Sequence, residues 1–317
     1  MHNIMEEVDQ VEILTLQDNS IDMVSQDNDE VIQRASSVKD GVIKNSILAE
    51  HGFSALVTVV REKKRRSIIF DFGFSEKGAA KNADALEADL NSVEAAALSH
   101  GHMDHTGGMA ALLDKVGKKG MEVVAHPEAF RAGRFKKVLP GLNVAFPPFT
   151  REMVHQAGAK PVEAETPYPL LDGEIFFLGG IPRLTDFEKG APHFYYQERD
   201  QEKWDDIPDD TAVVAHVKGK GLVVLSGCAH AGIINTVNYA RSVAGTEKIF
   251  AVMGGFHLGG PDMAPVIDPT VKALTEIDPT YVIPTHCTGR EAVMAIERQM
   301  PDRFVLNMSG TKLTFSS

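Results

Sequence analysis

The stretch SHGHMDHTGG (Ser99–Gly108) places three histidines and an aspartate within six consecutive positions. It directly follows the mostly apolar run 93–98, which is typical of a buried β-strand, and it leads into a helical pattern that begins near Gly107. Imidazole nitrogens and carboxylate oxygens are common ligands of catalytic metal ions. The stretch therefore predicts a metal site on a loop between a strand and a helix.

The spacing within this motif predicts two neighbouring metal positions. His100 and His102 are one residue apart on the loop, so both rings can face the same side and share one cation. Asp104 and His105 are adjacent and supply one oxygen and one nitrogen ligand, enough to begin a second position. We expect two divalent metal ions, with zinc first and manganese, iron or magnesium as alternatives.

Composition and charge argue against several classes of function. The 317 residues carry 32 Lys and Arg against 44 Asp and Glu, a net charge of −12, which opposes binding to nucleic acid. Every apolar run is much shorter than the ~20 residues of a membrane span, so we expect no membrane partner. The acidic N-terminal segment MHNIMEEVDQ lacks a secretory signal pattern, and we expect a cytoplasmic location. The oligomeric state stays open.

Short β-like runs alternate with helical patterns along the whole chain. Two β-rich halves with interleaved helices predict an α/β fold in which two packed sheets are covered outside by helices. The strands are expected at 11–16, 55–60, 67–70, 93–98, 211–217, 222–225, 249–253, 281–283 and 304–306. The helices are expected at about 75–90, 107–116, from about 231 onward, at 265–277 and at 289–299.

We expect one large domain over residues 1–317, with two domains as the second choice. The pattern weakens between residues 131 and 167, where four prolines occur. This segment is interpreted as an irregular connection or a partial lid over the site.

HGHMDH, with Ser before it and Thr-Gly-Gly after it, resembles the H-x-H-x-D-H signature of the metallo-β-lactamase superfamily. The resemblance implies a four-layer αββα sandwich with metals at one edge of the two sheets. Further fragments resemble the branch that contains the archaeal synthase joining a dihydropterin to a ribofuranosylaminobenzene phosphate, together with related metal-dependent hydrolases. These fragments are LQDNS (16–20), IIFDFG (68–73), GIPRLTDFE (180–188), LSGCAHAGIINTV (225–237), GGFHL (254–258) and PTHCTG (284–289).

Two histidines at later strand ends can complete the metal ligands. His286 matches the superfamily's last ligand, which follows a late strand. The resemblance also implies a histidine ligand in the region GGIPRLTDFE, which contains none, so either His230 replaces it or the first site lacks one ligand. Cys228 stands where the superfamily has a bridging aspartate. It is either a thiolate ligand or, more commonly for a lone cysteine, a small buried thiol.

Other residues are weaker candidates. His257 follows two glycines at a strand end and is expected to contact substrate or protonate a leaving group. Asp71 is expected to orient a ligating imidazole, with a turn residue as the alternative. Arg183 and Glu188 are expected at the substrate, where Arg183 could clamp a phosphate; a surface salt bridge between them is the alternative.

Asp18 and Asn19 form either a loop near the site or an ordinary turn. The basic run REKKRR (61–66) is expected to be a solvated hairpin tip rather than a nucleic-acid contact.

These observations predict a dinuclear metal-dependent hydrolase acting on a small ester or phosphoester. Two cations can lower the pKa of a shared water toward ~7, giving a metal-bound hydroxide as nucleophile, while Asp104 steers the proton. The alternative is a pterin-transferring synthase, in which diphosphate leaves and the substrate is phosphorylated or pterin-like. A redox or sensing protein ranks below both, because the diiron relatives need more acidic ligands than Asp104 alone.

Overall fold

The computed structural model describes residues 5–43 and 46–317; the first four residues of the acidic N-terminal segment lie outside this range. Its first large sheet contains eight strands from the N-terminal half and the C-terminus. In spatial order they are β12 (Lys160–Glu163), β9 (Glu122–Ala125), β8 (Val93–Ala97), β7 (Lys64–Phe70), β6 (Ser54–Arg61), β2 (Gln10–Gln17), β21 (Lys312–Ser316) and β3 (Ile32–Gln33).

The second large sheet is formed mainly by the C-terminal half of the chain. Its strands are, in order, β13 (Tyr168–Leu170), β14 (Ile175–Phe177), β17 (Ala212–Val217), β18 (Gly221–Ser226), β19 (Ile249–Gly255) and β20 (Tyr281–Thr285), with β1 (Glu7–Val8) pairing alongside β17. A separate two-stranded ribbon consists of β4 (Val38–Lys39) and β5 (Val42–Ile43).

The hairpin expected around REKKRR forms at the predicted place, and a second antiparallel hairpin joins β17 and β18. β6 and β7 pair from Ala55↔Phe70 to Arg61↔Lys64, so the basic run REKKRR turns at its tip. β17 and β18 pair from Ala212↔Ser226 to Val217↔Gly221. The strand expected at 304–306 does not form; an isolated bridge from Phe304 to Val282 stands there, because the sheet ends at β20.

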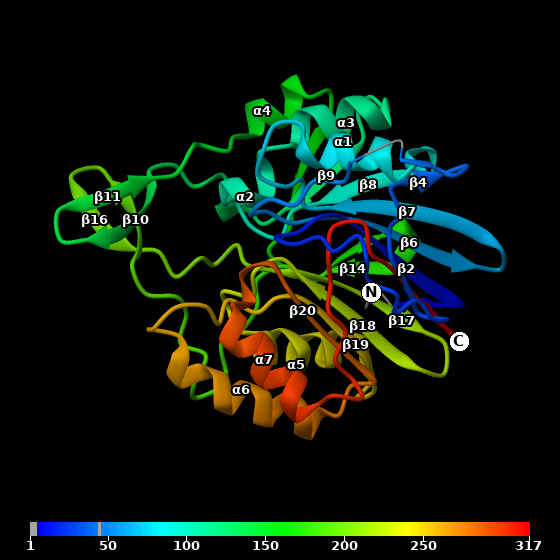
Figure 1. Ribbon diagram of the computed structural model, residues 1–317. Coiled ribbons are helices and arrows are strands. Elements are labelled where there is room, and N and C mark those ends of the chain that lie inside the picture. Colours follow the sequence, from blue (N-terminus) through cyan, green and yellow to red (C-terminus); the bar gives the residue numbers. More distant parts are fainter. Residues whose placement is uncertain (1–4, 44–45) are drawn as a thin grey trace.

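Helices cover the outer face of each sheet, as Figure 1 shows. The first sheet is covered by α1 (Gly78–Ala85), α3 (Met109–Val116) and α4 (Arg151–Gln156), and the second by α5 (Ile233–Ala244), α6 (Ala264–Ile277) and α7 (Arg290–Gln299). A short helix α2 (Met103–Thr106) and 3₁₀ turns at Leu90–Ser92, Pro127–Phe130, Leu171–Gly173 and His286–Thr288 complete the described elements. Helix α1 is shorter than the expected 75–90.

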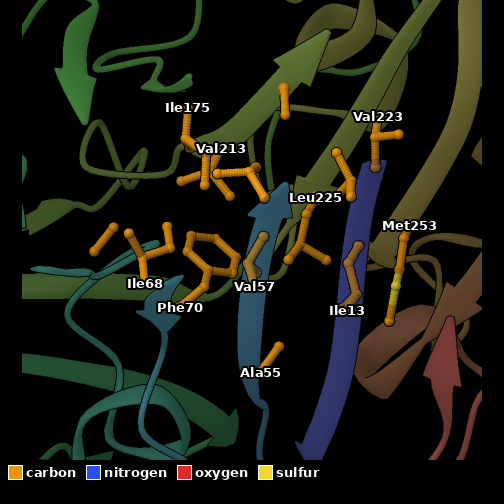
Figure 2. Packing of buried hydrophobic residues seen from close by; sticks show 14 of the residues in the cluster. Ile13, Ala55, Val57, Ile68, Phe70, Ile175, Val213, Val223, Leu225 and Met253 are labelled. Atoms are coloured by element: carbon orange, nitrogen blue, oxygen red, sulfur yellow. The ribbon is translucent and has the colours of Figure 1, made fainter. Parts of the chain in front are cut away.

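Three hydrophobic layers hold this sandwich together. The central layer packs residues of both sheets, including Ile13 and Val57 from one and Val213 and Leu225 from the other, and Figure 2 shows their side chains meeting between the strands. Separate layers lie between the first sheet and α1 and α3, and between the second sheet and α5–α7. The predicted αββα architecture is therefore confirmed. Within the described residues, none of the helices combines the length and apolar character needed to cross a bilayer.

Segment 131–167 is not the irregular connection that one interpretation predicted, while the other interpretation, a partial lid over the site, stays a prediction. It contains β10 (Arg134–Leu139), β11 (Leu142–Ala145), α4 and β12. β10 and β11 form a hairpin around Pro140 and Gly141, and they join β15 (Phe194–Glu198) and β16 (Gln201–Trp204) in a four-stranded sheet in the order β11-β10-β15-β16. We call this sheet the arm; it projects from the sandwich at the side where α2 lies (Figure 1).

Two of the four prolines occupy places where strands tolerate them, so they do not mark an irregular segment. Pro140 lies in the hairpin turn, and Pro161 lies on β12, an edge strand where a missing N–H costs no ladder bond. The strand pairing of the arm also depends on residues 194–204, far along the chain.

The parallel strands of both sheets direct their carboxyl ends to one edge of the sandwich. β7, β8 and β9 are parallel in the first sheet, and β18, β19 and β20 in the second. Because loops after parallel strands meet at the same edge, this edge is where a site is built. The segments that follow β8, β18, β19 and β20 carry the histidines singled out in the sequence.

Candidate metal centre

Three histidines form the first group of ligand atoms. The loop after β8 brings His100 Nε2 within 3.0 Å of His102 Nδ1. His230, on the loop between β18 and α5, lies with its Nε2 3.3 Å from His100 Nε2. Two ligands of a tetrahedral ion with bonds of about 2.0–2.1 Å are separated by roughly 3.3 Å, so these nitrogen pairs are spaced like ligands of one cation.

The loop backbone is held in place by close packing around Gly101. A Cβ atom at this position would lie 2.1 Å from the carbonyl oxygen of Ala129, so only glycine fits between the two histidines. The Gly101 N–H donates to Asp209 Oδ2 at 2.8 Å, and Asp209 also accepts from Arg134 Nη1 at 2.9 Å. Arg134 belongs to β10, so one buried carboxylate connects the histidine loop with the base of the arm.

A second group gathers around Asp104. His286 Nε2 lies 3.2 Å and His105 Nε2 3.8 Å from Asp104 Oδ2. Among the described residues, the buried His286 Nε2 has no hydrogen-bond partner of good geometry. Cys228 Sγ lies 3.2 Å from His105 Nε2. The ligand atoms of all four residues lie within 4.8 Å of one another.

Cys228 stands between the two groups. Its sulfur lies within 4.8 Å of ligand atoms of His100 and His230 as well as of the Asp104 group. It also lies within that distance of His257 and Cys287. Of the two sequence-based alternatives, the position between both groups favours a ligand over a merely buried thiol. Burial raises the pKa of this thiol, and a bound cation would oppose that effect by stabilising the thiolate.

Asp71 contacts His105, and its role in orienting a metal-ligating imidazole stays a prediction. Its Oδ2 lies 2.6 Å from His105 Nδ1, and both side chains are fully buried. The Ser99 N–H donates to Asp71 Oδ1 and the Ser99 hydroxyl donates to Oδ2, each at 2.7 Å. These bonds fix the carboxylate, so the other ring nitrogen of His105 is directed toward Cys228.

His286 is held by the loop after β2. Asp18 Oδ1 accepts the His286 N–H at 2.9 Å, and Asn19 Oδ1 lies 3.2 Å from His286 Nδ1. Asp18 and Asn19 therefore belong to the surroundings of the site rather than to an unrelated turn.

Burial keeps the first group of histidines neutral. It lowers the pKa values of His100 and His230, and together with Arg134 it lowers the pKa of His102 to about 3. Neutral imidazoles are the form that binds metal. Burial also opposes protonation of His105, but Asp71 and Asp104 outweigh it and raise its pKa to about 9. A cation binding at His105 Nε2 would therefore displace a proton.

Unfavourable backbone conformations occur at several residues of this site as well as elsewhere in the chain. Asp71, Ala229, His257 and His286 all have positive φ angles, between 45° and 60°. Such conformations are unfavourable for residues with a Cβ and typically occur at functional sites. The sandwich holds them where the ligand atoms converge.

A pocket of about 480 Å³ opens onto both groups. Its lining combines the ligands with residues of the arm: Asn19, His51, His102, Met103, Asp104, Lys136, Val138, Val144, Phe146, Phe194, Cys228, His230, His257, His286, Cys287 and Gly289. The arm thus forms one wall of the pocket, and the candidate ligand side chains form its floor.

Comparison with known proteins agrees with this geometry. The profile of the metallo-beta-lactamase superfamily matches residues 52–233, more than half of the chain. The chain belongs to the metallo-β-lactamase superfamily.

Two relatives within this superfamily come from Methanocaldococcus jannaschii. One is the 7,8-dihydropterin-6-methyl-4-(beta-D-ribofuranosyl)-aminobenzene-5'-phosphate synthase, 29% identical over 84% of this chain and 90% of the relative. The other is an uncharacterized protein, 27% identical over 82% of this chain and 92% of the relative. A crystal structure of a metal-dependent hydrolase of the β-lactamase superfamily aligns with a TM-score of 0.73 and 26% identity, covering 97% of this chain and all of the other.

The superfamily pattern implies a histidine ligand that residues 179–188 lack, and His230 supplies a third imidazole instead. His230 comes from the loop after β18, yet its Nε2 reaches His100 Nε2. The first group therefore contains three imidazoles without a contribution from residues 179–188.

Glu188 and Arg183 do not lie where the expected substrate contacts would require. Glu188 is buried, and its two oxygens accept the N–H groups of Ile234 and Asn235, each at 2.8 Å, at the start of α5. Because both oxygens are occupied there, we assign Glu188 to the stability of the helix. Arg183 does not line the pocket; it donates to the backbone oxygen of Asp206. No salt bridge joins Arg183 to Glu188 in the described residues.

Several residues of the pocket were not singled out in the sequence. One of them is His51, whose Nε2 lies 3.4 Å from Asp104 Oδ2 and whose ring lies 4.8 Å from that of His286. Lys136, Phe146 and Phe194 were missed because they belong to the arm. No local motif marks them, because residues 134–139 (RFKKVL) do not alternate apolar and polar side chains as a half-buried strand would.

Proposed function

We propose that this superfamily member is a dinuclear metal-dependent hydrolase acting on a small ester or phosphoester. The observation that carries the proposal is the meeting of two ligand groups at Cys228, beneath a pocket that admits a small molecule. A structural metal site would instead be closed by its ligands.

Each group supplies ligands for one ion in this proposal. His100, His102 and His230 would hold the first, Asp104, His105 and His286 would hold the second, and the Cys228 thiolate would lie between them. Zinc suits these imidazole and thiolate donors better than magnesium, which prefers oxygen. Divalent cations bound here supply Lewis-acid polarisation of the scissile group and lower the pKa of water to near 7.

The side chains around the ligands suit proton movement. His257 lines the pocket with its ring 4.2 Å from that of His230, and its buried Nδ1 has no hydrogen-bond partner among the described residues. It is placed to protonate a leaving group. Asp104 can pass protons to His51, whose side chain is 64% exposed and reaches solvent.

The test is metal content together with hydrolysis. The purified chain should bind two zinc ions and hydrolyse at least one of bis(p-nitrophenyl) phosphate, p-nitrophenyl phosphate and p-nitrophenyl butyrate. His102→Ala should lose both metal and turnover, whereas His155→Ala, at an exposed position on α4, should lose neither. Full hydrolysis by His102→Ala would refute the site.

The second candidate is a pterin-transferring synthase, favoured by the similarity to the archaeal enzyme over most of both chains. In that reaction diphosphate leaves from the pterin partner as the aminobenzene partner attacks. Diphosphate release only when a dihydropterin diphosphate and the ribofuranosylaminobenzene phosphate are both present would replace the hydrolase proposal by this one.

A further inference from the structure

One row of the arm sheet faces the metal pocket. Lys136 on β10 is the register partner of Val144 on β11 and of Phe194 on β15, so the three residues lie side by side across three strands. All three line the pocket. The arm therefore presents a cation flanked by apolar side chains to any molecule bound above the ligands.

Lys136 carries a positive charge without an acidic partner in the part of the chain that the structure describes. Across residues 5–43 and 46–317, it makes no ion pair or hydrogen bond, and its Nζ lies 4.9 Å from the centroid of the Phe194 ring. The next residue differs: Lys137 pairs with Glu202 at 2.6 Å and lies 4.1 Å from the Tyr195 ring centroid. Successive strand residues point to opposite faces, so Lys137 belongs to the outer face and Lys136 to the pocket.

Lys136 is also the only lysine or arginine in the described lining of this pocket. The remaining arm residues there are Val138, Val144, Phe146 and Phe194, and apolar surroundings strengthen an ion pair relative to water. The chain as a whole carries a net charge of −12 and repels anions. A local cation at the pocket is therefore the feature that would select an anionic ligand.

The aromatic residues of the pocket form a second recognition surface. The His102 ring stacks on Phe194, with 5.3 Å between centroids and 18° between planes, and its edge contacts Phe146 at 4.9 Å. Both phenylalanines thus lie directly beside the first ligand group. An apolar or planar body packed against them would lie next to the ligand atoms.

We propose that Lys136 binds an anionic group of the substrate, a phosphate or carboxylate, separate from the bond that is cleaved, while Phe146 and Phe194 pack against its apolar or planar part. This inference rests on the proposed hydrolase function and specifies its substrate class as a small anionic ester. It makes Lys136 a specificity-determining residue.

Calorimetric titration of the full zinc-loaded chain tests the inference with phenylphosphonate, benzoate and neutral benzyl alcohol as probes. Lys136→Met should raise the Kd of the preferred anionic probe roughly tenfold, Lys136→Arg should restore most of the affinity, and benzyl alcohol should not distinguish the variants. Lys137→Met is the matched control on the opposite face and should bind like the wild type. The tighter of the two anions identifies phosphate or carboxylate as the preferred group.

Equal anion affinity of Lys136→Met and the wild type would overturn the inference. The same titration with His102→Ala, which should lack metal, separates anion binding by the arm from anion binding by the metal ions. Residual anion binding that still depends on Lys136 supports the arm as the binding element. Failure of every ester to be hydrolysed would refute the proposed function but would leave a Lys136-dependent affinity standing. The two failures are therefore distinguishable.

Discussion

His105 Nδ1 and Asp71 Oδ2 lie 2.6 Å apart, and neither side chain is accessible to solvent. The carboxylate decides which ring nitrogen of His105 faces Cys228, and it raises the basicity of that ring. We therefore propose that Asp71 prepares His105 as a metal ligand rather than touching a substrate.

Asp71→Asn should weaken zinc binding roughly 10–100-fold, because the amide cannot supply the negative charge that supports His105. Asparagine tolerates the positive φ of this position and keeps an oxygen for the Ser99 N–H, so the fold should persist. Competition with a chromophoric chelator measures the affinity. Asp114→Asn, at an exposed position on α3, is the control, and unchanged zinc affinity of Asp71→Asn would contradict the assignment.

Cys228→Ala should weaken metal binding in both groups, because its sulfur lies between them. With cobalt in place of zinc, the wild type should show a thiolate-to-cobalt charge-transfer band that Cys228→Ala lacks. Cys287→Ala should keep this band, because Cys287 groups with His257 and Cys228 and not with the remaining ligands. A band that survives in Cys228→Ala would show that this thiol is not a ligand.

His257→Gln should lower kcat by roughly 100-fold for esters with poor leaving groups, because such groups need a proton to depart. Metal content should stay the same, and p-nitrophenyl esters should be affected much less. A plot of log kcat against the pKa of the leaving group measures the difference. An equal loss for all leaving groups would argue for a positioning role, and His155→Ala serves as the control.

The ion pair between Asp209 and Arg134 should make the free energy of unfolding depend on pH in the acidic range. Burial raises the pKa of Asp209, but Arg134 outweighs it and lowers the pKa from 3.8 to about 2. The folded state then gains roughly 2 kcal/mol whenever the pH is above 3.8, and this gain disappears as the pH falls toward 2.

Asp209→Asn should therefore lower the free energy of unfolding by roughly 2–4 kcal/mol at pH 7 and by less at pH 3. Urea unfolding at both pH values measures the difference from the wild type. Asp206→Asn, at the exposed neighbouring acid, should show little effect. A difference that stays constant between pH 7 and pH 3 would rule out ionisation of Asp209 as its source.

The histidine loop and the layered fold could be predicted from the sequence because both depend on local sequence patterns. The motif around His100 and His102 is continuous, and apolar runs mark strands such as β6 and β18 directly. His286 could be suggested from its position after a strand. In these cases a short stretch of chain carries the whole signal.

The remaining features depend on distant segments of the chain. Whether His230 reaches His100 is decided by how the two sheets pack, and the arm requires pairing of Phe135 with Tyr195, sixty positions apart. Glu188 was expected at a substrate because it is charged within a recognised fragment, but burial against the start of α5 gives it backbone partners instead. Such contacts follow from tertiary packing and produce no hydrophobic periodicity in the sequence.

The arm and the metal ligands have different structural origins, and this has an evolutionary consequence. The candidate ligands follow the ends of sheet strands, whereas Lys136, Val138 and Val144 sit on a hairpin of the arm, which projects from the sandwich (Figure 1). Substitutions in this hairpin can exchange one substrate for another while the reaction chemistry is inherited unchanged. Selection for a new substrate should thus act first on residues 136–146, and a library confined to them should yield altered preference without loss of metal.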